Sequence, residues 1–303
     1  MKTLAPIALF VYNRPEHTRR TLRFLAMNQL AVESRLFIFS DGAKNGGDED
    51  RVNEVRALAR GAEGFRSVEL IERPKNFGLA ESIIHGVTEL VKKYGKIIVF
   101  EDDLVSSPYT LRYFNDALEL YKDTGKVMHI AAYMYPLKAA GLPETFFYRA
   151  ASSWGWATWE RAWNHFEPDI GKLVARFDNE RIKRFSIDGT MNFWKQVQEF
   201  RNRRNNSWAI RWYASVFLAG GLTLNPAKSL INNIGHDGTG VHSGVNDIYQ
   251  VTVSEAPVTS FPTVIAEHPE AYAAIKSFLR TRKGSLWDRA VRFLREKMVR
   301  AGR

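Results

Sequence analysis

The sequence has no cysteine among its 303 residues. Disulfide bridges, thiolate metal sites and cysteine nucleophiles are therefore excluded, and the absence fits a reducing compartment such as the cytoplasm. The sequence also lacks any apolar run near the roughly 20 residues that span a bilayer. Its first apolar segment, residues 4–12, runs directly into Asn13-Arg14-Pro15-Glu16 with no small-residue cleavage site, so we expect a first strand there rather than a signal peptide.

Acidic residues are scarce near the C-terminus. Residues 275–303 contain ten Lys and Arg against two acids, so they carry +8 of the net charge of +10. Apolar residues recur there at helical spacing: Trp287, Ala290, Val291, Leu294 and Met298. This pattern predicts a basic amphipathic helix on an anionic membrane surface, and hence a peripheral protein at the inner face of the membrane. A docking helix with solvated charges is the alternative. Nucleic acid is not expected as a partner, because no nucleic-acid motif accompanies the charge.

What the sequence does contain is an alternation of strand-like and amphipathic helical segments. We expect strands at residues 6–12, 36–40, 68–71 and 96–100, and helices at residues 18–30, 48–60, 79–91 and 111–121. The βαβαβαβ order predicts an α/β fold with a doubly wound, mostly parallel sheet. The second half is less regular, and without a break in composition we expect it to complete the same sheet.

Three acids end the fourth expected strand. Lys96-Ile97-Ile98-Val99-Phe100 is followed at once by Glu101-Asp102-Asp103. Ligands of open α/β sheets bind beyond the carboxyl ends of strands, and carboxylates suit Mg²⁺ or Mn²⁺ bridging to phosphates. The triplet thus favours a metal-bridged diphosphate. The alternative is an acidic helix start, capped by the following Ser106-Ser107-Pro108.

Polar groups also follow the other expected strands. Val11-Tyr12-Asn13-Arg14 ends the first strand, and Asp41 ends the second. Asn76-Phe77-Gly78 opens the helix that begins near residue 79, where backbone N–H groups can meet an anionic ligand. Each of these residues alone could simply cap a helix or a turn. Their position at successive strand ends favours a nucleotide-binding site.

These segments together resemble the Rossmann-like GT-A fold of nucleotide-sugar glycosyltransferases, both bacterial enzymes of the family-2 type and the N-acetylglucosaminyltransferase I group. The resemblance covers roughly residues 6–242 and rests on four segments: Phe10-Val11-Tyr12-Asn13-Arg14-Pro15, Phe39-Ser40-Asp41-Gly42, Lys75-Asn76-Phe77-Gly78-Leu79-Ala80 and Glu101-Asp102-Asp103. It implies a Mn²⁺ or Mg²⁺ ion bound by Asp103, with Glu101 and Asp102 facing the donor's sugar and ribose. It also implies that Arg14 and Asp41 hold the nucleotide, for which UDP is favoured.

Two further segments resemble the same group. The first is Ser152-Ser153-Trp154-Gly155-Trp156-Ala157-Thr158-Trp159, where aromatic faces suit a sugar, and Trp154 and Trp156 become acceptor candidates. Packing in the core is the alternative for most of these tryptophans. The second segment, residues 232–242, forms a loop over the donor in the group, which makes His236 and His242 candidates near the metal or a phosphate.

One departure from the group concerns the general base. An inverting transferase needs a base to deprotonate the acceptor hydroxyl, and relatives commonly carry an acid where this chain has Ala209. Either the protein is an inactivated version that still binds donor, which we favour, or the base lies elsewhere, with Asp237 and Asp188 as weaker candidates. Position 209 could also simply pack.

The sequence therefore predicts a metal-dependent, inverting glycosyltransferase that moves a hexosyl or N-acetylhexosaminyl group from a nucleotide-sugar to a cell-surface glycan or lipid-linked acceptor. Residues 1–267 would form the GT-A domain, with a nucleotide-binding half at 1–125 and an acceptor-side half at 126–267, and residues 268–303 a basic helical tail. A catalytically dead nucleotide-sugar-binding partner is the alternative. A sugar nucleotidyltransferase is a third reading, disfavoured because Tyr12-Asn13-Arg14-Pro15 is not a glycine-rich phosphate loop.

Overall fold

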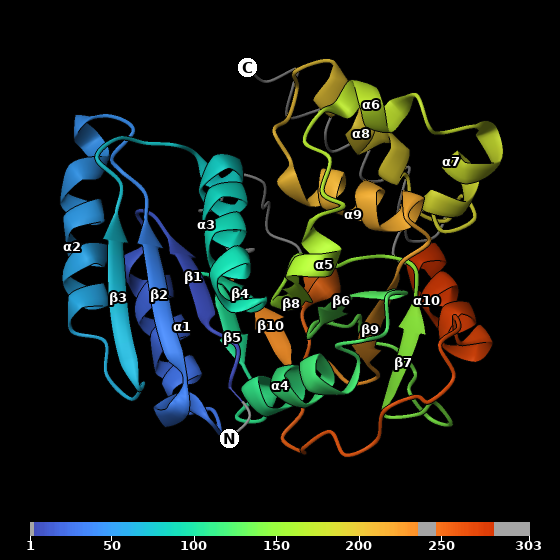
Figure 1. The fold of residues 1–303 in the computed structure, drawn as a ribbon, viewed down its shortest axis with the longest axis horizontal. Helices are drawn as coiled ribbons and strands as arrows, with labels where there is room; N and C mark the ends of the chain where they lie inside the picture. Colours follow the sequence, from blue (N-terminus) through green and yellow to red (C-terminus); the bar gives the residue numbers. More distant parts are fainter. Residues whose placement is uncertain (1–2, 236–246, 282–303) are drawn as a thin grey trace, which may run out of the picture.

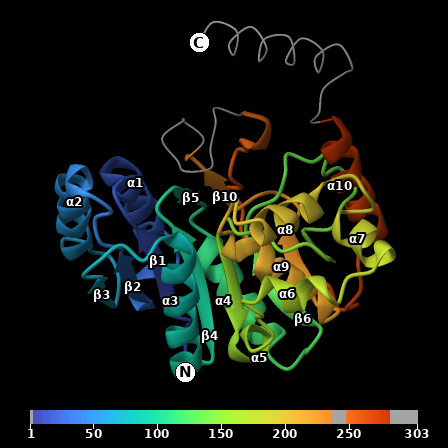
Figure 2. The same cartoon turned by 90° about the horizontal axis from the view of Figure 1, so that it is seen from above.

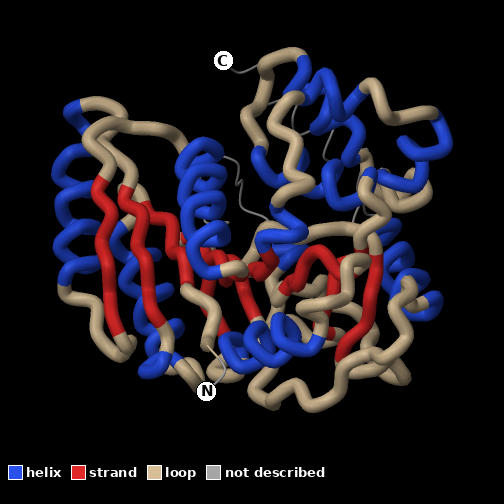
Figure 3. Tube along the Cα trace, viewed as in Figure 1, coloured by secondary structure: helices blue, strands red, loops and turns tan. Residues whose placement is uncertain are grey.

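The computed structural model describes residues 3–235 and 247–281. Their centre is an eight-stranded sheet in the order β3-β2-β1-β4-β8-β6-β9-β7 (Figure 1). A separate two-stranded sheet pairs β10 with β5. Helices lie on both sides of the large sheet, as the colouring in Figure 3 makes plain.

The first four strands of the large sheet are parallel. β1 (Ile7–Val11) pairs with β2 (Arg35–Ser40) on one side and with β4 (Lys96–Glu101) on the other, and β3 (Ser67–Glu72) pairs with β2. The connecting elements are listed in chain order: α1 (Pro15–Ala26), η1 (Ala31–Glu33), η2 (Gly46–Asp48), α2 (Glu49–Arg60) and α3 (Leu79–Tyr94). The expected strands and helices of this half are confirmed, with ends that differ by a few residues.

The second half extends the same sheet, as expected. β8 (Trp156–Trp159) is antiparallel to both β4 and β6 (Val127–Ala131), β9 (Leu222–Pro226) is parallel to β6, and β7 (Thr145–Tyr148) is antiparallel to β9. Six of the eight strands therefore run in one direction, and the predicted mostly parallel α/β sheet is confirmed.

The remaining elements surround these strands. They are β5 (Leu104–Ser106), α4 (Thr110–Leu120), α5 (Glu160–Trp163), α6 (Ile170–Val174), α7 (Asn179–Phe185), α8 (Phe193–Arg201), α9 (Trp208–Leu218), β10 (Ile231–Asn233), η3 (Asp247–Tyr249) and α10 (Pro269–Thr281).

Both faces of the parallel strands are buried, which explains their continuous apolar runs. Alternate residues of β1 point to opposite faces: Ile7 and Leu9 join a core with α1, α2 and α4, whereas Ala8 and Phe10 join a core with α3, α5 and α9. Figure 2 shows α1 and α2 together on one side of these strands. The first turns of helices on both faces thereby lie near the strand ends that carry the predicted site.

A third apolar cluster holds the last described helix. Ala271, Tyr272, Ile275 and Leu279 of α10 are buried in it. The chain up to residue 281 thus packs on the fold, whereas residues 282–303, most of the predicted basic tail, lie outside the described residues. The proposed division into domains stays a prediction. No helix within residues 3–235 and 247–281 is long and apolar enough to cross a membrane.

Candidate functional site

The strand order reverses beside β1, and we refer to the carboxyl ends of β1 and β4 as the crevice. The chain builds β1, β2 and β3 outward in one direction and then returns to place β4 on the other side of β1. In open α/β sheets this reversal marks the ligand site, at the carboxyl ends of the two strands. Asn13-Arg14 follow β1 and Asp102-Asp103 follow β4, so the predicted polar residues flank this crevice.

The acidic triplet does not begin a helix. Glu101 is the last residue of β4, and Asp102-Asp103 connect it to the short strand β5. α4 begins only at Thr110. β5 pairs with β10 in a register that sets Asn233 opposite Leu104, so a segment from far along the chain lies over the acids. The helix-start alternative is wrong for this segment.

Asp103 is held by groups from two other parts of the chain. An Nη1 atom of Arg14 lies 3.1 Å from its Oδ2, and Nδ2 of Asn233 donates to its Oδ1 at 3.3 Å. The backbone N–H of Ile234 donates to its carbonyl at 2.8 Å. At Gly235 a Cβ atom would lie 2.2 Å from Asp103 Oδ2, so only glycine allows this approach. The Asp103 carboxylate is therefore fixed, and its side chain keeps 17% exposure.

Negative charge exceeds positive charge among the described side chains of this crevice. Burial, followed by the charges of Asp103 and Asp102, raises the pKa of Glu101 well above its usual value. Burial and Asp103 raise the pKa of Asp102 to about 7, against the opposing effect of Arg14. Arg14 lies 3.8 Å from Asp102. Among the described side chains, the charge of this one guanidinium therefore acts on all three acids.

These residues fit a hard divalent cation. Their ligand atoms are carboxylate oxygens, which Mg²⁺ and Mn²⁺ prefer, and such ions commonly use one or two protein carboxylates plus phosphates. Within the described residues no three His, Asp or Glu side chains converge as a complete protein cage. The arrangement therefore suits an ion shared with a phosphate-bearing ligand.

Asp41 organises the neighbouring loop. Its Oδ1 accepts hydrogen bonds from the backbone N–H groups of Gly42 and Phe77, at 3.0 and 2.8 Å, and its Oδ2 accepts from that of Gly78 at 2.8 Å. Asn76 Nδ2 donates to the carbonyl of Gly42 at 2.8 Å. Gly78 has a φ of +77°, which suits glycine at the start of α3. Asp41 and Asn76 thus fix the loop that opens α3 beside the crevice.

Asp48 is a residue of this region that the sequence did not reveal. Tyr12 donates its hydroxyl to Asp48 Oδ2 at 2.9 Å, and Asn13 Nδ2 donates to Asp48 Oδ1 at 2.7 Å. Burial, together with Asp48, raises the pKa of the Tyr12 phenol. Asp48 looks like an ordinary acid at a helix start, and no local signal links it to residues 36 positions earlier in the chain. It holds Tyr12 and Asn13, which follow Val11 at the end of β1.

The two acceptor-candidate tryptophans differ in setting. Trp154 is half-buried and packs edge-on to Tyr133, with ring centroids 4.4 Å apart. Trp156 is fully buried and stacks on Trp208 and on His129. The structure therefore gives Trp156 a core role and leaves Trp154 as the tryptophan with some exposed surface.

Ala209 lies in the first turn of α9. Ser207 caps this helix by accepting the backbone N–H of Ile210, and no acid occupies the first turn. Ala209 is partly buried against the core cluster that contains Phe10 and Ala80, at the start of α3. An acidic side chain at position 209 would thus project from the N-terminus of a helix.

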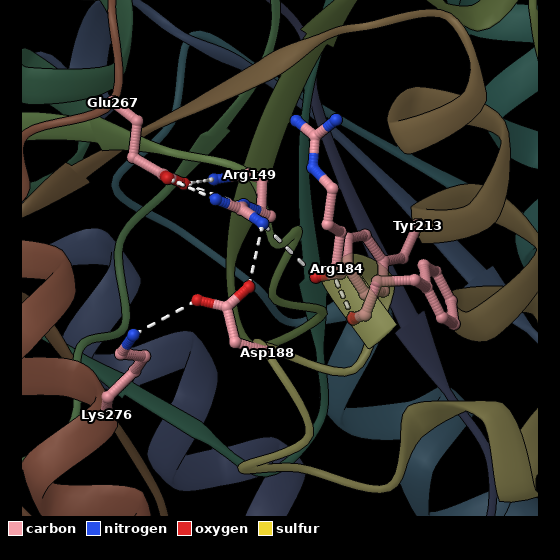
Figure 4. Close-up of polar contacts among 7 residues, drawn as sticks. Arg149, Arg184, Asp188, Tyr213, Glu267 and Lys276 are labelled. Carbon is pink, nitrogen blue, oxygen red and sulfur yellow. Dashed lines mark hydrogen bonds and ion pairs between the residues drawn. The ribbon is translucent and has the colours of Figure 1, made fainter. Parts of the chain in front are cut away.

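The weaker base candidates are placed elsewhere or not described. Asp188 lies 3.0 Å from Lys276 Nζ and 3.5 Å from Arg149 Nη1 (Figure 4). Burial alone would raise its pKa, but the Lys276 hydrogen bond and the Arg149 charge outweigh it and lower the pKa of Asp188. Its hydrogen bonds and ion pairs within the described chain do not involve the strand-end residues. Asp237, His236 and His242 lie outside the described residues.

Comparisons with known proteins give only distant likenesses. No protein-family model and no curated protein sequence matches the chain. Among solved structures it is similar to a mannosyltransferase, PcManGT from Pyrobaculum calidifontis, in complex with GDP-Man and Mn²⁺: TM-score 0.41, 12% identity, 71% of this chain and 70% of that chain. It is also similar to residues 1–349 of TarS from S. aureus: TM-score 0.41, 11% identity, 75% of this chain and 59% of that chain. The chain thus spans less than two thirds of that TarS chain. Scores this low report a shared layout at most.

Proposed function

We propose that this protein is a metal-dependent glycosyltransferase that takes its sugar from a nucleotide-diphosphate donor. The observation that carries the proposal is the meeting of Arg14 with Asp102 and Asp103 in the crevice between β1 and β4. Among the described side chains, one guanidinium faces three buried or half-buried acids, which leaves a shortfall of positive charge. A divalent cation bound together with a diphosphate would complete this charge balance.

In this proposal, each polar residue of the crevice has its own role. Asp103 would hold the Mn²⁺ or Mg²⁺ ion, which when bound stabilises the negative charge of the leaving nucleotide diphosphate. Asp41 holds the loop that begins α3, so that its backbone is positioned before the donor arrives. Asp48 orients Tyr12 and Asn13 in the same way. The choice of UDP, the inverting course and a glycan or lipid-linked acceptor follow only from the family resemblance.

A second candidate is a donor-binding protein that does not transfer sugar. The observation that favours it is the first turn of α9, which carries Ala209 and no acid. An inverting displacement requires a group that accepts the acceptor's hydroxyl proton, and a methyl group cannot do so. The two candidates share the donor site and differ only in turnover.

Donor binding is tested first by thermal shift, because binding needs no general base. UDP, GDP, dTDP, CMP and their common sugar conjugates are each added with and without Mn²⁺. We expect one nucleotide to raise the melting temperature in a Mn²⁺-dependent way, since a ligand present at about 100 times its Kd stabilises by about 2.7 kcal/mol. Asp103→Asn should lose that rise.

Asp116→Asn serves as the matched control. Asp116 is an exposed acid on α4 that pairs with Arg112, so its loss changes the net charge equally without touching the crevice. This control should keep the wild-type response. A Mn²⁺-dependent shift that survives in Asp103→Asn, or no shift with any nucleotide, would contradict the proposal.

A further inference from the structure

A pocket of about 360 Å³ lies away from the crevice, at the amino-terminal ends of β6 and β9. Its volume falls within the roughly 300–1,000 Å³ of small-molecule sites. Five further segments and β9 line it; these segments lie before β6, after β7, in α7, at the end of α9 and before α10. The lining residues are Lys126, Arg149, Arg181, Arg184, Phe217, Leu218, Gly220, Gly221, Leu222, Ala266 and Glu267. We call it the basic pocket, because four cations face one carboxylate.

Part of this charge is already paired. Arg149 forms a two-armed ion pair with Glu267 and also contacts Asp188 (Figure 4). Burial would lower the pKa of Arg149, but the hydrogen bond and charge of Glu267 prevail and raise it. Arg149 and Glu267 therefore act as a fixed wall, and the positive charge that remains comes from Lys126, Arg181 and Arg184.

The charged ends of two of those cations, Lys126 and Arg184, form no hydrogen bond or ion pair with the described residues. In Figure 4 the Arg184 guanidinium extends away from the Arg149–Glu267 pair, and no dashed line reaches it. Arg181 donates to the carbonyl of Arg176 at 2.6 Å and lies 3.7 Å from Asp178. Arg184 and Lys126 are thus available to a ligand.

The backbone of the pocket offers little to an anion. The N–H groups of Gly220, Gly221 and Leu222 donate to the carbonyls of Phe217, Val216 and Lys126 respectively. Recognition would therefore depend on side chains. Phe217, Leu218 and Leu222 add an apolar wall beside the cations.

Helix ends alone do not explain this charge. Arg184 lies in the last turn of α7, where a cation complements the helix dipole. Lys126, however, precedes a strand rather than ending a helix. Cations from separate segments therefore converge on one pocket, which a dipole of one helix does not require.

We propose that the basic pocket binds a phosphate group carried on an apolar or partly apolar molecule. A guanidinium supplies paired N–H donors that match phosphate oxygens, and an ammonium adds a point charge. The phosphate would lie between Arg184 and Lys126, with its carbon substituent against Phe217 and Leu222. This site is separate from the crevice and does not depend on the proposed function.

The test measures binding of phenyl phosphate by titration calorimetry in about 150 mM salt with EDTA, so that no divalent cation loads the crevice. A parallel arm uses vesicles that contain phosphatidic acid. We expect saturable binding by the wild type and at least about tenfold weaker binding by the double variant Arg184→Gln/Lys126→Gln, since charge-assisted hydrogen bonds contribute about 1.5–3 kcal/mol each and 1.4 kcal/mol is tenfold. Lys183→Gln, an exposed neighbour on α7 outside the pocket lining, should change affinity less than about twofold.

The outcomes separate the sources of the phosphate. Loss of phenyl phosphate binding in the double variant, with an unchanged melting temperature, supports a small phosphate ligand. Loss only of vesicle binding, taken as the difference between wild type and double variant, supports a lipid headgroup. No binding of either probe by the wild type, or equal binding by the double variant, overturns the proposal.

Discussion

At the scale of single residues, Ala209 decides between the two candidate functions. Its place in the first turn of α9 is where an acid would be stabilised by the helix dipole. Nothing about its packing requires alanine, because the position is only partly buried. We therefore expect a substitution at position 209 to change the chemistry of the site without disrupting the core.

Ala209→Asp should raise sugar transfer by about 10²–10⁴-fold if a general base is what the chain lacks. Turnover is measured as nucleotide release from the donor that the thermal-shift panel selects. Ala209→Asn is the matched control, since its amide has a similar shape and cannot take a proton. Flat turnover in Ala209→Asp with donor binding retained would mean that the base is not supplied from this position.

Asp41 and Asp48 show how a charged residue at a strand or helix end can serve a site indirectly. Both carboxylates are occupied by groups of the protein: Asp41 by three backbone N–H groups, Asp48 by the side chains of Tyr12 and Asn13. Each fixes part of the polypeptide around the crevice. The sequence identified Asp41 by its place after a strand, whereas no sequence pattern indicated a role for Asp48.

At the scale of elements, His129 joins β6 to α9. Trp212 on α9 donates its indole N–H to His129 Nδ1 at 3.0 Å, so the ring must carry its proton on Nε2, which lies 2.9 Å from the carbonyl of Ser152. The neutral ring satisfies both partners. Burial lowers the pKa of His129 to about 3.

The buried, neutral His129 ring predicts that the stability of the fold depends on pH. Because the folded pKa lies below the unfolded value of about 6.5, the unfolded chain binds the proton first, and stability present above pH 6.5 is lost as the pH falls toward 3. Between pH 7 and pH 5 the loss from this group is about 2 kcal/mol. Urea unfolding at both pH values should show a drop that is smaller by about that amount in His129→Gln.

His165→Gln provides the control for that measurement. His165 is exposed beyond the end of α5, and its side chain forms no hydrogen bond or ion pair with the described residues. Its replacement should leave the pH 7 to pH 5 difference as in the wild type. A His129→Gln difference equal to the wild type would show that His129 does not carry this pH dependence.

At the scale of the whole molecule, most of the net charge belongs to residues that follow the last described helix. α10 ends at Thr281 and is anchored by buried Ile275 and Leu279, whereas most of the cations counted from residue 275 onward follow it. A truncation that tests the membrane prediction should therefore end at residue 281, because removal from 275 would also open the core.

We expect the full chain to sediment with anionic vesicles and the chain ending at residue 281 to stay in solution. Eight of the ten cations from residue 275 onward are lost, and each contributes about 1 kcal/mol near an anionic surface. Neutral vesicles and an unchanged melting temperature serve as controls. Equal sedimentation of both chains would assign membrane binding to another surface.

The sequence by itself determined the α/β layout and the residues at the strand ends. Strands that are buried on both faces need unbroken apolar runs, and the helices that connect parallel strands need an amphipathic pattern. Both patterns are local, so they can be recognised in a single sequence. The same patterns marked Arg14, Asp41 and Asp103, because polar groups that follow such runs fall at one edge of the sheet.

Only the tertiary structure decided what these groups contact. The return of the chain to place β4 beside β1 brings Arg14 to Asp103, and the pairing of β5 with β10 sets Asn233 and Gly235 against the same carboxylate. The tertiary structure likewise places Lys126 and Arg184 in the lining of one pocket, the basic pocket. Such contacts depend on strand order and on long-range pairing, and no local pattern in a single sequence encodes which distant segments will meet.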